Sequence, residues 1–246
     1  IMSGKVLTTR GNTNNHIGVA QNIVRMNGDE RCVSLEMGTN HPGEIAVLAK
    51  IVQAHGAILT TVGASHIGNF SGVEAILEEK LDIFRYMAPN GIAVLPENLR
   101  EEAEKRLGRD DLKIVSFGSE ATSDVQLLKY DISESSSSFT LKFKDGEQLD
   151  FSCSLSGVHQ LMNLSACIAL LKNFEEQFNF KVADLGDAMQ RLELPGMRMN
   201  IEKNGGVTYV LDCYNANPQS TEAFLNWAEE VYSGGIDRKS TRLNSS

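Results

Sequence analysis

The stretch EMGTNHPGEI (residues 36–45), followed by TTVGASHIGNF (60–70) and EEKLDIF (78–84), decides the fold class of this chain. The run 32–37 is short and mostly apolar, as expected for a strand covered on both faces, and it stops at Gly38. Pro42 suits the first position of a following helix, and Glu44 suits its first turn, where negative charge meets the helix dipole. Glu36 is therefore predicted at the carboxyl end of a strand, where open α/β sheets bind ligands.

A second strand and helix repeat this arrangement further along the chain. A strand over about 57–62 is predicted to run into the loop 63–66, which places His66 at a second strand end. Ser71, with Glu74 three residues later, has the spacing of a capping box that opens a helix. The alternation of strand and helix predicts a mostly parallel sheet flanked by helices.

The helix after Ser71 carries one residue that does not fit its pattern. Its apolar positions recur every three or four residues, at Val73, Ile76, Leu77, Leu81, Phe84 and Met87. Lys80 falls in the middle of this stripe, and the acidic side chains predicted on the opposite face are those of Glu78, Glu79 and Asp82. A buried, unpaired ammonium ion is costly, so Lys80 either extends its charged end to water or has a chemical role.

Glu36, His66 and Lys80 together provide a carboxylate, an imidazole and an amine that can be neutralised or modified. These groups suit a site that holds a divalent metal ion and a phosphate. Each residue also has an ordinary structural explanation, since lone loop histidines and half-buried lysines are common in proteins without such a site. Spacing alone leaves both interpretations open.

Composition limits the class of protein. With 246 residues, 41% of them apolar, the chain is long enough for a substantial core, and no apolar run approaches a membrane span of roughly 18–20 residues. The formal charge of −9 argues against nucleic-acid binding. We therefore expect a soluble protein. Its four cysteines form no CxxC pair and no disulfide framework, which favours a reducing, cytoplasmic setting. Cys32, Cys167 and Cys213 lie in apolar segments and are expected to fill the core.

The second half of the chain changes character. Strands over about 92–95 and 113–117, separated by a helix at 97–107, continue the α/β pattern, whereas 125–132, 139–143 and 148–153 predict an antiparallel appendage. A helix is predicted from His159 to about 174, then a hairpin that turns at 204–206 and a helix that begins at Ser220 and Thr221. The predicted domains are 1–196, 197–236, which begins a second α/β domain, and a tail over 237–246 that reads as disordered or as a translated sequencing adapter.

Several segments, in this order, resemble the Mur ligases: TTRGNTNNHIGV (8–19), LEMGTNHPGEI (35–45), GASHIGNF (63–70), EEKLDIF (78–84), LPGMRMNI (194–201) and LDCYNANPQS (211–220). The resemblance extends from about Lys5 to Trp227. It implies the central ATP-binding domain of an amide ligase of peptidoglycan biosynthesis. The EMG-x-NHPGEI and GN-x-NN-x-IGV forms resemble the members that join D-alanyl-D-alanine to a UDP-N-acetylmuramoyl-tripeptide through an acyl phosphate.

The resemblance also implies roles for individual residues. It implies Mg²⁺ ligation by Glu36, His66 and Lys80, with Lys80 carbamylated. It implies contacts to ATP by Asn163 with the adenine, Arg198 with the phosphates and Asp212 with the ribose or nucleotide. Substrate-facing residues by the same resemblance are Asn14, Asn15, Tyr214, Asn215 and Asn217. His16 and Gln160 depart from the residues usual in the family and are given no role.

No segment matches G-x-x-x-x-G-K-[ST], the loop whose amides and lysine bind ATP phosphates. By resemblance this loop would lie just upstream of Ile1, so we expect this fragment to be inactive by itself, and we expect a monomer. Two alternatives stay open. A sister amide ligase, of another Mur type or of the folylpolyglutamate type, would share Glu36, His66 and Lys80. A non-catalytic nucleotide-binding paralogue would keep the fold and lose the phosphate-loop lysine.

Overall fold

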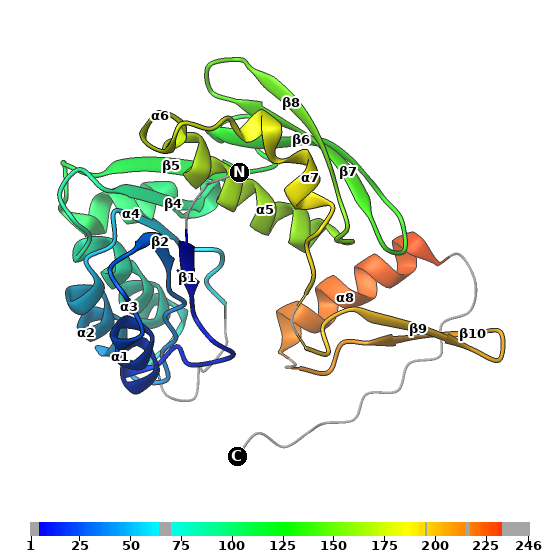
Figure 1. Ribbon diagram of the computed structural model, residues 1–246, viewed down its shortest axis with the longest axis horizontal. Helices are drawn as coiled ribbons and strands as arrows, with labels where there is room; N and C mark the ends of the chain where they lie inside the picture. The colour runs from blue at the N-terminus through cyan, green and yellow to red at the C-terminus, as the bar shows by residue number, and fades with distance from the viewer. Residues whose placement is uncertain (1–4, 64–69, 195, 215–216, 233–246) are drawn as a thin grey trace. The chain divides into compact units, whose positions relative to one another are not determined.

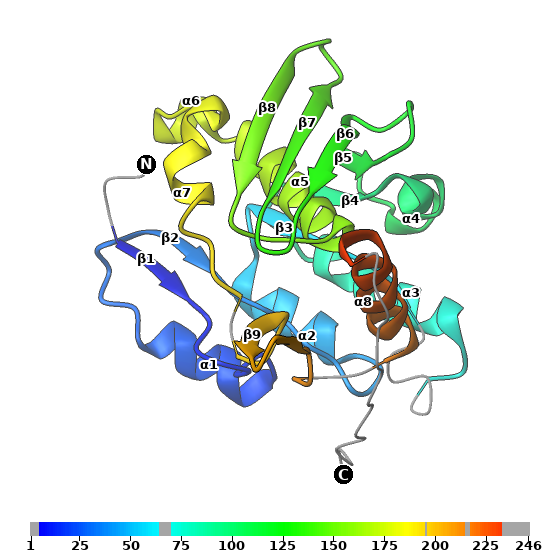
Figure 2. The ribbon, with the colours of Figure 1, turned by 90° about the vertical axis from the view of Figure 1, so that its right-hand side faces the viewer.

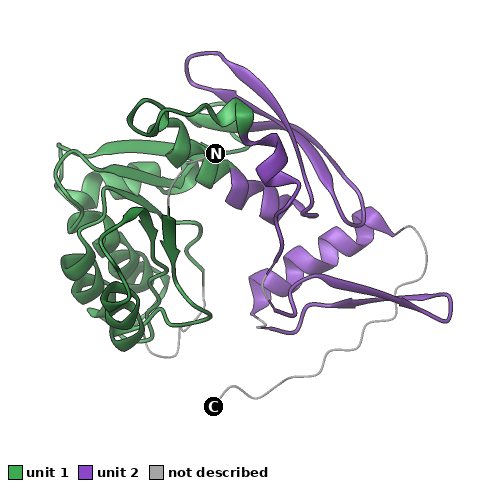
Figure 3. Cartoon of the chain, viewed as in Figure 1, with its two compact units in different colours: residues 1–126, 165–184 green, residues 127–164, 185–246 purple. Residues whose placement is uncertain are grey.

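The computed structural model describes residues 5–63, 70–194, 196–214 and 217–232 (Figure 1). By their internal contacts these residues form two compact units (Figure 3). One consists of residues 1–126 and 165–184, and the other of residues 127–164 and 185–246. Each unit consists of two separate stretches of the chain, so this division does not test the domain boundary predicted at residues 196 and 197, which stays a prediction. The predicted tail 237–246 lies outside the described residues.

The first unit is built from parallel strands joined by helices. Strand β1 (Lys5–Thr8) pairs in parallel with β2 (Glu30–Ser34), and β3 (Gly56–Ile58), β4 (Ile92–Pro96) and β5 (Lys113–Gly118) are successive parallel neighbours. Parallel neighbours need crossover connections, and helices supply them here. They are α1 (His16–Val24), α2 (Glu44–Val52), α3 (Val73–Arg85) and α4 (Arg100–Leu107), the last preceded by the short turn η2 (Glu97–Leu99) (Figure 2).

The larger sheet is mixed. Its strand order is β3-β4-β5-β6-β7-β8, where β6 is Val125–Ile132, β7 is Ser137–Phe143 and β8 is Gln148–Cys153. The first residues of β6 run parallel to β5, and β7 pairs antiparallel with β8. The predicted α/β class with an antiparallel appendage is therefore confirmed. The boundary between the two units falls within β6.

The second unit contains a hairpin and the last described helix. Helix α5 (Val158–Lys172) starts in this unit, and α6 (Glu175–Phe178), η3 (Val182–Leu185) and α7 (Gly186–Met189) follow it in the chain. Strands β9 (Asn200–Asn204) and β10 (Val207–Leu211) pair antiparallel. Gly205 and Gly206 connect them with φ of 59° and 78°, the left-handed values that a tight two-residue hairpin needs.

Helix α8 (Pro218–Val231) ends the described part of the chain. Asn217 caps it, since its side chain accepts from the Ser220 amide while Ser220 bonds back to the cap. Trp227 is buried, and its indole N–H donates to the Ser156 hydroxyl at 2.6 Å. This bond fixes α8 against the segment that precedes α5 within the same unit.

The core of the first unit confirms the apolar stripe predicted for α3. Buried side chains from this helix pack with those of β3, β4 and α4 in one cluster, and Val19, Ile45 and Leu48 form a smaller cluster between α1 and α2. The stripe residues Ile76, Leu77, Leu81, Phe84 and Met87 are buried, whereas Val73, at the first position of the helix, is 48% exposed.

Three local predictions were wrong. The capping box of Ser71 and Glu74 is absent from α3, which begins with Gly72 as its cap and without a side-chain cap bond. Pro42 precedes α2 instead of occupying its first position, because Gly43 at φ 90° forms the cap. Cys167 and Cys213 are exposed and Cys32 is half-buried. Cys167 lies one helical turn after the exposed Asn163, so it belongs to the open face of α5 instead of the buried one.

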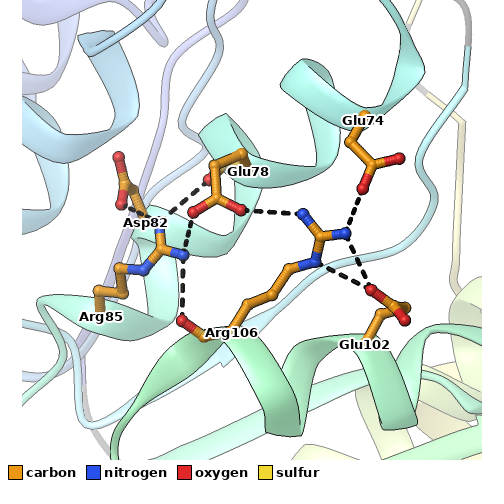
Figure 4. Close-up of polar contacts among 6 residues, drawn as sticks. All are labelled: Glu74, Glu78, Asp82, Arg85, Glu102 and Arg106. Carbon is orange, nitrogen blue, oxygen red and sulfur yellow. Dashed lines mark hydrogen bonds and ion pairs between the residues drawn. The ribbon is translucent and has the colours of Figure 1, made fainter.

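Two networks of charged residues support the first unit. One is buried at β5, where the Asp124 carboxylate accepts the Ser116 amide at 3.0 Å and binds the Arg100 guanidinium. The other joins the outer faces of α3 and α4 and is partly exposed (Figure 4). Its members are Arg85 and Arg106 with the carboxylates of Glu74, Glu78, Asp82 and Glu102.

Candidate functional site

The carboxyl ends of β1 and β2 carry two loops that are bonded to each other. The Asn14 side-chain amide donates to Glu36 Oε1 at 2.8 Å, and the Gly38 amide donates to the Asn14 carbonyl at 2.9 Å. The Glu36 backbone amide donates to Thr9 Oγ1 at 2.8 Å. Main chain and side chain of Glu36 are therefore both fixed by the loop that follows β1.

Asn15 performs a different task in the same loop. Its side-chain oxygen accepts from the amides of Ile17 at 3.1 Å and Gly18 at 2.9 Å, which caps α1. Asn14 and Asn15 were both predicted to face substrate. In the described structure one orients Glu36 and the other caps a helix, and contact with substrate stays a prediction for each.

Asn22 is a structural centre of this loop that the sequence did not single out. It is 2% exposed, and its amide donates to Thr13 Oγ1 at 2.9 Å and to the Gly18 carbonyl at 2.8 Å. Its oxygen accepts from Arg25 Nη1 at 2.7 Å and from the Arg10 amide at 3.4 Å. An asparagine inside an apolar helical run was the available signal, because buried amides need partners.

Lys80 is half-buried on α3, and its ammonium donates to the Thr61 carbonyl, just after β3, at 2.8 Å. Burial lowers the pKa of this lysine from its ordinary value. The predicted anomaly is therefore real in physical terms. A larger neutral fraction of the amine is also the condition for its reaction with carbon dioxide.

Glu79, next to Lys80, contradicts the predicted sorting of charges on α3. It was expected on the polar face with Glu78 and Asp82, but it is 5% exposed. Its carboxylate accepts from the amides of Gly43 at 2.6 Å and Ile45 at 2.8 Å. The helical period could not reveal this, because the burial comes from α2, which packs against α3 at this position.

The predicted metal ligands can be compared with what the structure shows of them. Glu36 presents a hard carboxylate oxygen held by an amide, and Lys80 presents an amine of lowered pKa that would become a second oxygen ligand if carbamylated. His66 lies outside the described residues. In the described ranges, no group of three or more His, Cys, Asp and Glu side chains is arranged to hold a metal ion. The donor chemistry of Glu36, together with that of Lys80 if it is carbamylated, fits Mg²⁺.

The predicted nucleotide-binding residues lie in the second unit. The Arg198 guanidinium carbon is 4.4 Å from the centre of the Tyr214 ring, a cation–π contact, and the Asp212 carboxylate accepts the Met199 amide at 3.3 Å. Arg198, Asp212 and Tyr214 are thus brought together around the segment 197–199. Asn163 is exposed on α5, Asn217 caps α8, and Asn215 lies outside the described residues.

His159 belongs to the same unit and was not assigned a role. Burial lowers the pKa of its imidazole, and the negative charge of Asp212 opposes that shift. The position of His159 at the start of α5 in GVHQLMN was the signal in the sequence.

Two further features of the described residues bear on function. A surface cavity of about 450 Å³ runs along β1, with Lys5, Arg10, Arg25 and Glu30 among its lining residues, and none of the predicted site residues that the structure describes lines it. No helix among the described residues is long and apolar enough to cross a membrane.

Comparison with known proteins identifies one family and one group of relatives. The Mur ligase middle domain matches residues 1–171. The chain is 29% identical over 230 residues to the UDP-N-acetylmuramoyl-tripeptide--D-alanyl-D-alanine ligase of Bacillus subtilis, covering 92% of this chain and 48% of that protein. The enzyme of the same name from Escherichia coli is 27% identical over 229 residues, which covers 93% of this chain and 50% of that protein.

Solved structures agree. MurF from Acinetobacter baumannii superimposes with a TM-score of 0.84 at 27% identity, covering 94% of this chain and 49% of that one. MurF from Thermotoga maritima in complex with ADP gives 0.78 at 26% identity, covering 93% and 51%. FPGS from L. casei, at 16% identity and a TM-score of 0.68, shares the fold. The chain spans about half the length of the curated relatives it matches.

Proposed function

The chain belongs to the Mur ligase family, whose middle domain it carries over residues 1–171, and we propose that it works within an ATP-dependent ligase that joins D-alanyl-D-alanine to a UDP-N-acetylmuramoyl-tripeptide. The observation that carries this proposal is Glu36, held by Asn14 at 2.8 Å at the carboxyl end of a parallel strand. It occurs in a chain that is 29% identical to a relative named for this reaction. A cytoplasmic location and a monomeric state belong to the same proposal.

The chemistry requires activation of a carboxylate. The γ-phosphoryl group of ATP is transferred to the terminal carboxylate of the tripeptide, which gives an acyl phosphate and ADP. The amine of D-alanyl-D-alanine then attacks the acyl carbon, an amide bond forms, phosphate leaves and the amine loses a proton. Such transfers depend mainly on positioning and on neutralising charge, so the site needs fixed ligands more than a protein nucleophile.

Glu36, His66 and Lys80 are the residues that would hold Mg²⁺. When bound, the ion neutralises the charge on the phosphate oxygens during transfer. Lys80 reaches this role by carbamylation, in which its neutral amine forms a bond to the carbon of CO₂ and releases a proton. The lowered pKa and the half-buried position of Lys80 support this step, because both favour the neutral amine.

Asn163, Arg198 and Asp212 are the proposed contacts to ATP. The relative from Thermotoga maritima was solved in complex with ADP. Arg198 is suited to phosphate because its planar guanidinium can grip two oxygens at once, and the Tyr214 ring at 4.4 Å restricts its orientation beforehand. Asn14, Asn15, Tyr214, Asn215 and Asn217 complete the proposal as substrate-facing residues.

The test is a coupled assay on a ligase that includes this chain together with the contiguous upstream segment. Phosphate release is expected only when ATP, the UDP-muramoyl-tripeptide and D-alanyl-D-alanine are all present. Glu36→Gln and Lys80→Ala are expected to lower kcat strongly. Turnover with glutamate and a folate in place of these substrates would instead identify the sister amide ligase. An upstream segment without a phosphate-loop lysine, and no turnover, would identify a non-catalytic paralogue.

A further inference from the structure

We propose that Glu79 is a positioning residue that sets the register between α3, which carries Lys80, and the loop 36–44, which carries Glu36. The inference deepens the proposed function and rests on it for the roles of Glu36 and Lys80. Its physical basis is independent of that function, since it consists of the contacts of one buried carboxylate.

Helix α2 lacks a cap of its own. The residue at its cap position is Gly43, with φ 90° and no side chain to accept a hydrogen bond. The first amides of a helix have no partner within it and carry partial positive charge. Glu79 supplies the missing acceptor from a different helix, at 2.6 Å from the Gly43 amide and 2.8 Å from the Ile45 amide. The N-terminus of α2 is therefore anchored to α3.

A third contact extends this anchor into the loop. Thr39 Oγ1 lies 3.0 Å from Glu79 Oε1 and 2.9 Å from the His41 carbonyl, so its one hydroxyl proton is shared between these two acceptors, and Thr39 is three residues after Glu36. Residues 40–44 are closed on themselves, because the Glu44 carboxylate accepts the amides of Asn40 at 2.6 Å and His41 at 3.1 Å, while Glu36 and Gly38 are bonded to Asn14. The loop that carries Glu36 is thus bonded on one side to the loop after β1 and on the other side to the start of α2. The contacts of Glu79 join this bonded assembly to α3 and hold it in one position relative to that helix.

Burial of a carboxylate at this place calls for an explanation. An apolar residue would serve the packing of α2 on α3 without the cost of removing a charge from water. Glu79 immediately precedes Lys80, and neighbouring helical residues are separated by a rise of only about 1.5 Å. Any slide or rotation of α3 against α2 moves Lys80 relative to Glu36. Ligands of one ion must stay within about 0.5 Å of their working positions, so a directional contact is needed where apolar packing would permit sliding.

The experiment uses the 246-residue chain and compares Glu79→Gln with Glu78→Gln. The first variant keeps the shape of the side chain but replaces one of its two acceptor oxygens by an NH₂ donor, so that either the Gly43 amide or the Ile45 amide loses its acceptor. The second removes the charge of the neighbouring carboxylate, which pairs with Arg85 and with Arg106 of α4 and does not bond to α2 in any described contact. Amide hydrogen exchange by NMR is expected to accelerate at least tenfold at Gly43 or Ile45, whichever loses its acceptor, in Glu79→Gln alone, and the Gly38 resonance should shift as well.

A titration with Mn²⁺ alone, followed by EPR, tests positioning as distinct from stability. Binding is expected to weaken at least fivefold in Glu79→Gln and to match the wild type in Glu78→Gln, even where both variants lose the same stability to urea. Faster exchange at Gly43 or Ile45 with an unmoved Gly38 resonance and unchanged Mn²⁺ affinity would show that Glu79 only caps α2, which overturns the proposal. Unchanged exchange at Gly43 and Ile45 would overturn it as well.

Failure of the proposed function gives a different result. If the wild-type chain does not bind Mn²⁺, or binds it equally well after Glu36→Gln, the metal assignment is wrong. The register proposal is then decided by the spectra alone. A Glu79→Gln shift that reaches both Gly38 and Lys80 supports it, and a shift confined to the first turn of α2 refutes it.

Discussion

Replacing Asn14 by alanine should weaken metal binding with little loss of stability. The substitution removes the amide that donates to Glu36 Oε1 at 2.8 Å, but it retains the Asn14 carbonyl that accepts the Gly38 amide. A hydrogen bond to a charged group contributes about 1.5–3 kcal/mol. The bond between Asn14 and Glu36 is solvent-exposed, so we assign it about 1–2 kcal/mol. That range corresponds to a loss of about 5- to 30-fold in affinity, in line with losses on removing partners of metal ligands.

The assay is an EPR titration of the chain with Mn²⁺, with urea unfolding measured alongside. Asn12→Ala is the matched control, because Asn12 belongs to the same loop and contributes its backbone oxygen to the bonding there. Asn12→Ala should bind as the wild type does and lose less than about 1 kcal/mol of unfolding free energy, whereas Asn14→Ala should lose no more than the about 1–2 kcal/mol assigned to its bond. Equal affinity of Asn14→Ala and wild type, with binding abolished by Glu36→Gln, would refute the view that Asn14 orients the ligand.

Three further substitutions test the physical account. Arg100→Ala should cost about 3 kcal/mol of unfolding free energy in urea, because it removes the guanidinium that binds the buried carboxylate of Asp124. Arg106→Ala on the partly exposed network should cost less than about 1 kcal/mol. Equal losses would contradict this. Burial lowers the folded-state pKa of Lys80 below its usual value near 10.5. At pH values between the folded-state pKa and the usual value, the unfolded chain therefore binds more protons than the folded chain. Stability of the wild type should therefore rise with pH there, and Lys80→Met, measured in CO₂-free buffer, should be the more stable chain at pH 7 with an advantage that shrinks toward pH 10. Gly18→Ala should lose about 1–3 kcal/mol, since a Cβ there would lie 2.5 Å from backbone carbon of the preceding loop; a neutral result would mean that the loop can move away.

Much of the fold could be predicted because its signals are local. The apolar runs that became β4, β5 and β6 and the turn at Gly205 and Gly206 depend on residues close in sequence, and their predicted positions agree with the structure to within a residue or so. Caps were predicted less well. Ser71 and Glu74 have capping-box spacing, but Glu74 binds Arg106 of α4 instead. A partner distant in sequence outcompeted the local one, and spacing carries no information about such a partner.

The site shows the same limit. Glu36 and Lys80 could be singled out because each breaks a pattern visible along the chain: a polar residue ends an apolar strand, and a cation interrupts an apolar stripe. Asn22 breaks a pattern too, although more weakly, because one amide in an apolar helix has many ordinary explanations. What the sequence could not supply was the bonding between loops. The contact of Asn14 with Glu36 depends on β1 and β2 being parallel neighbours.

Glu79 and Lys80 make the distinction between pattern and environment concrete. They are consecutive residues of one helix, yet the sequence placed the lysine correctly and the glutamate wrongly. A helical period assigns each residue to a face by assuming that the helix packs against one apolar surface. Helix α3 has two neighbours, because Lys80 bonds to the segment after β3 and Glu79 bonds to the N-terminus of α2. A cation among apolar residues is unusual whatever surrounds it. An acidic residue on an apparently polar face becomes unusual only when an uncapped helix end is found opposite, so a buried carboxylate of this kind has to be sought from the amides that lack a local acceptor.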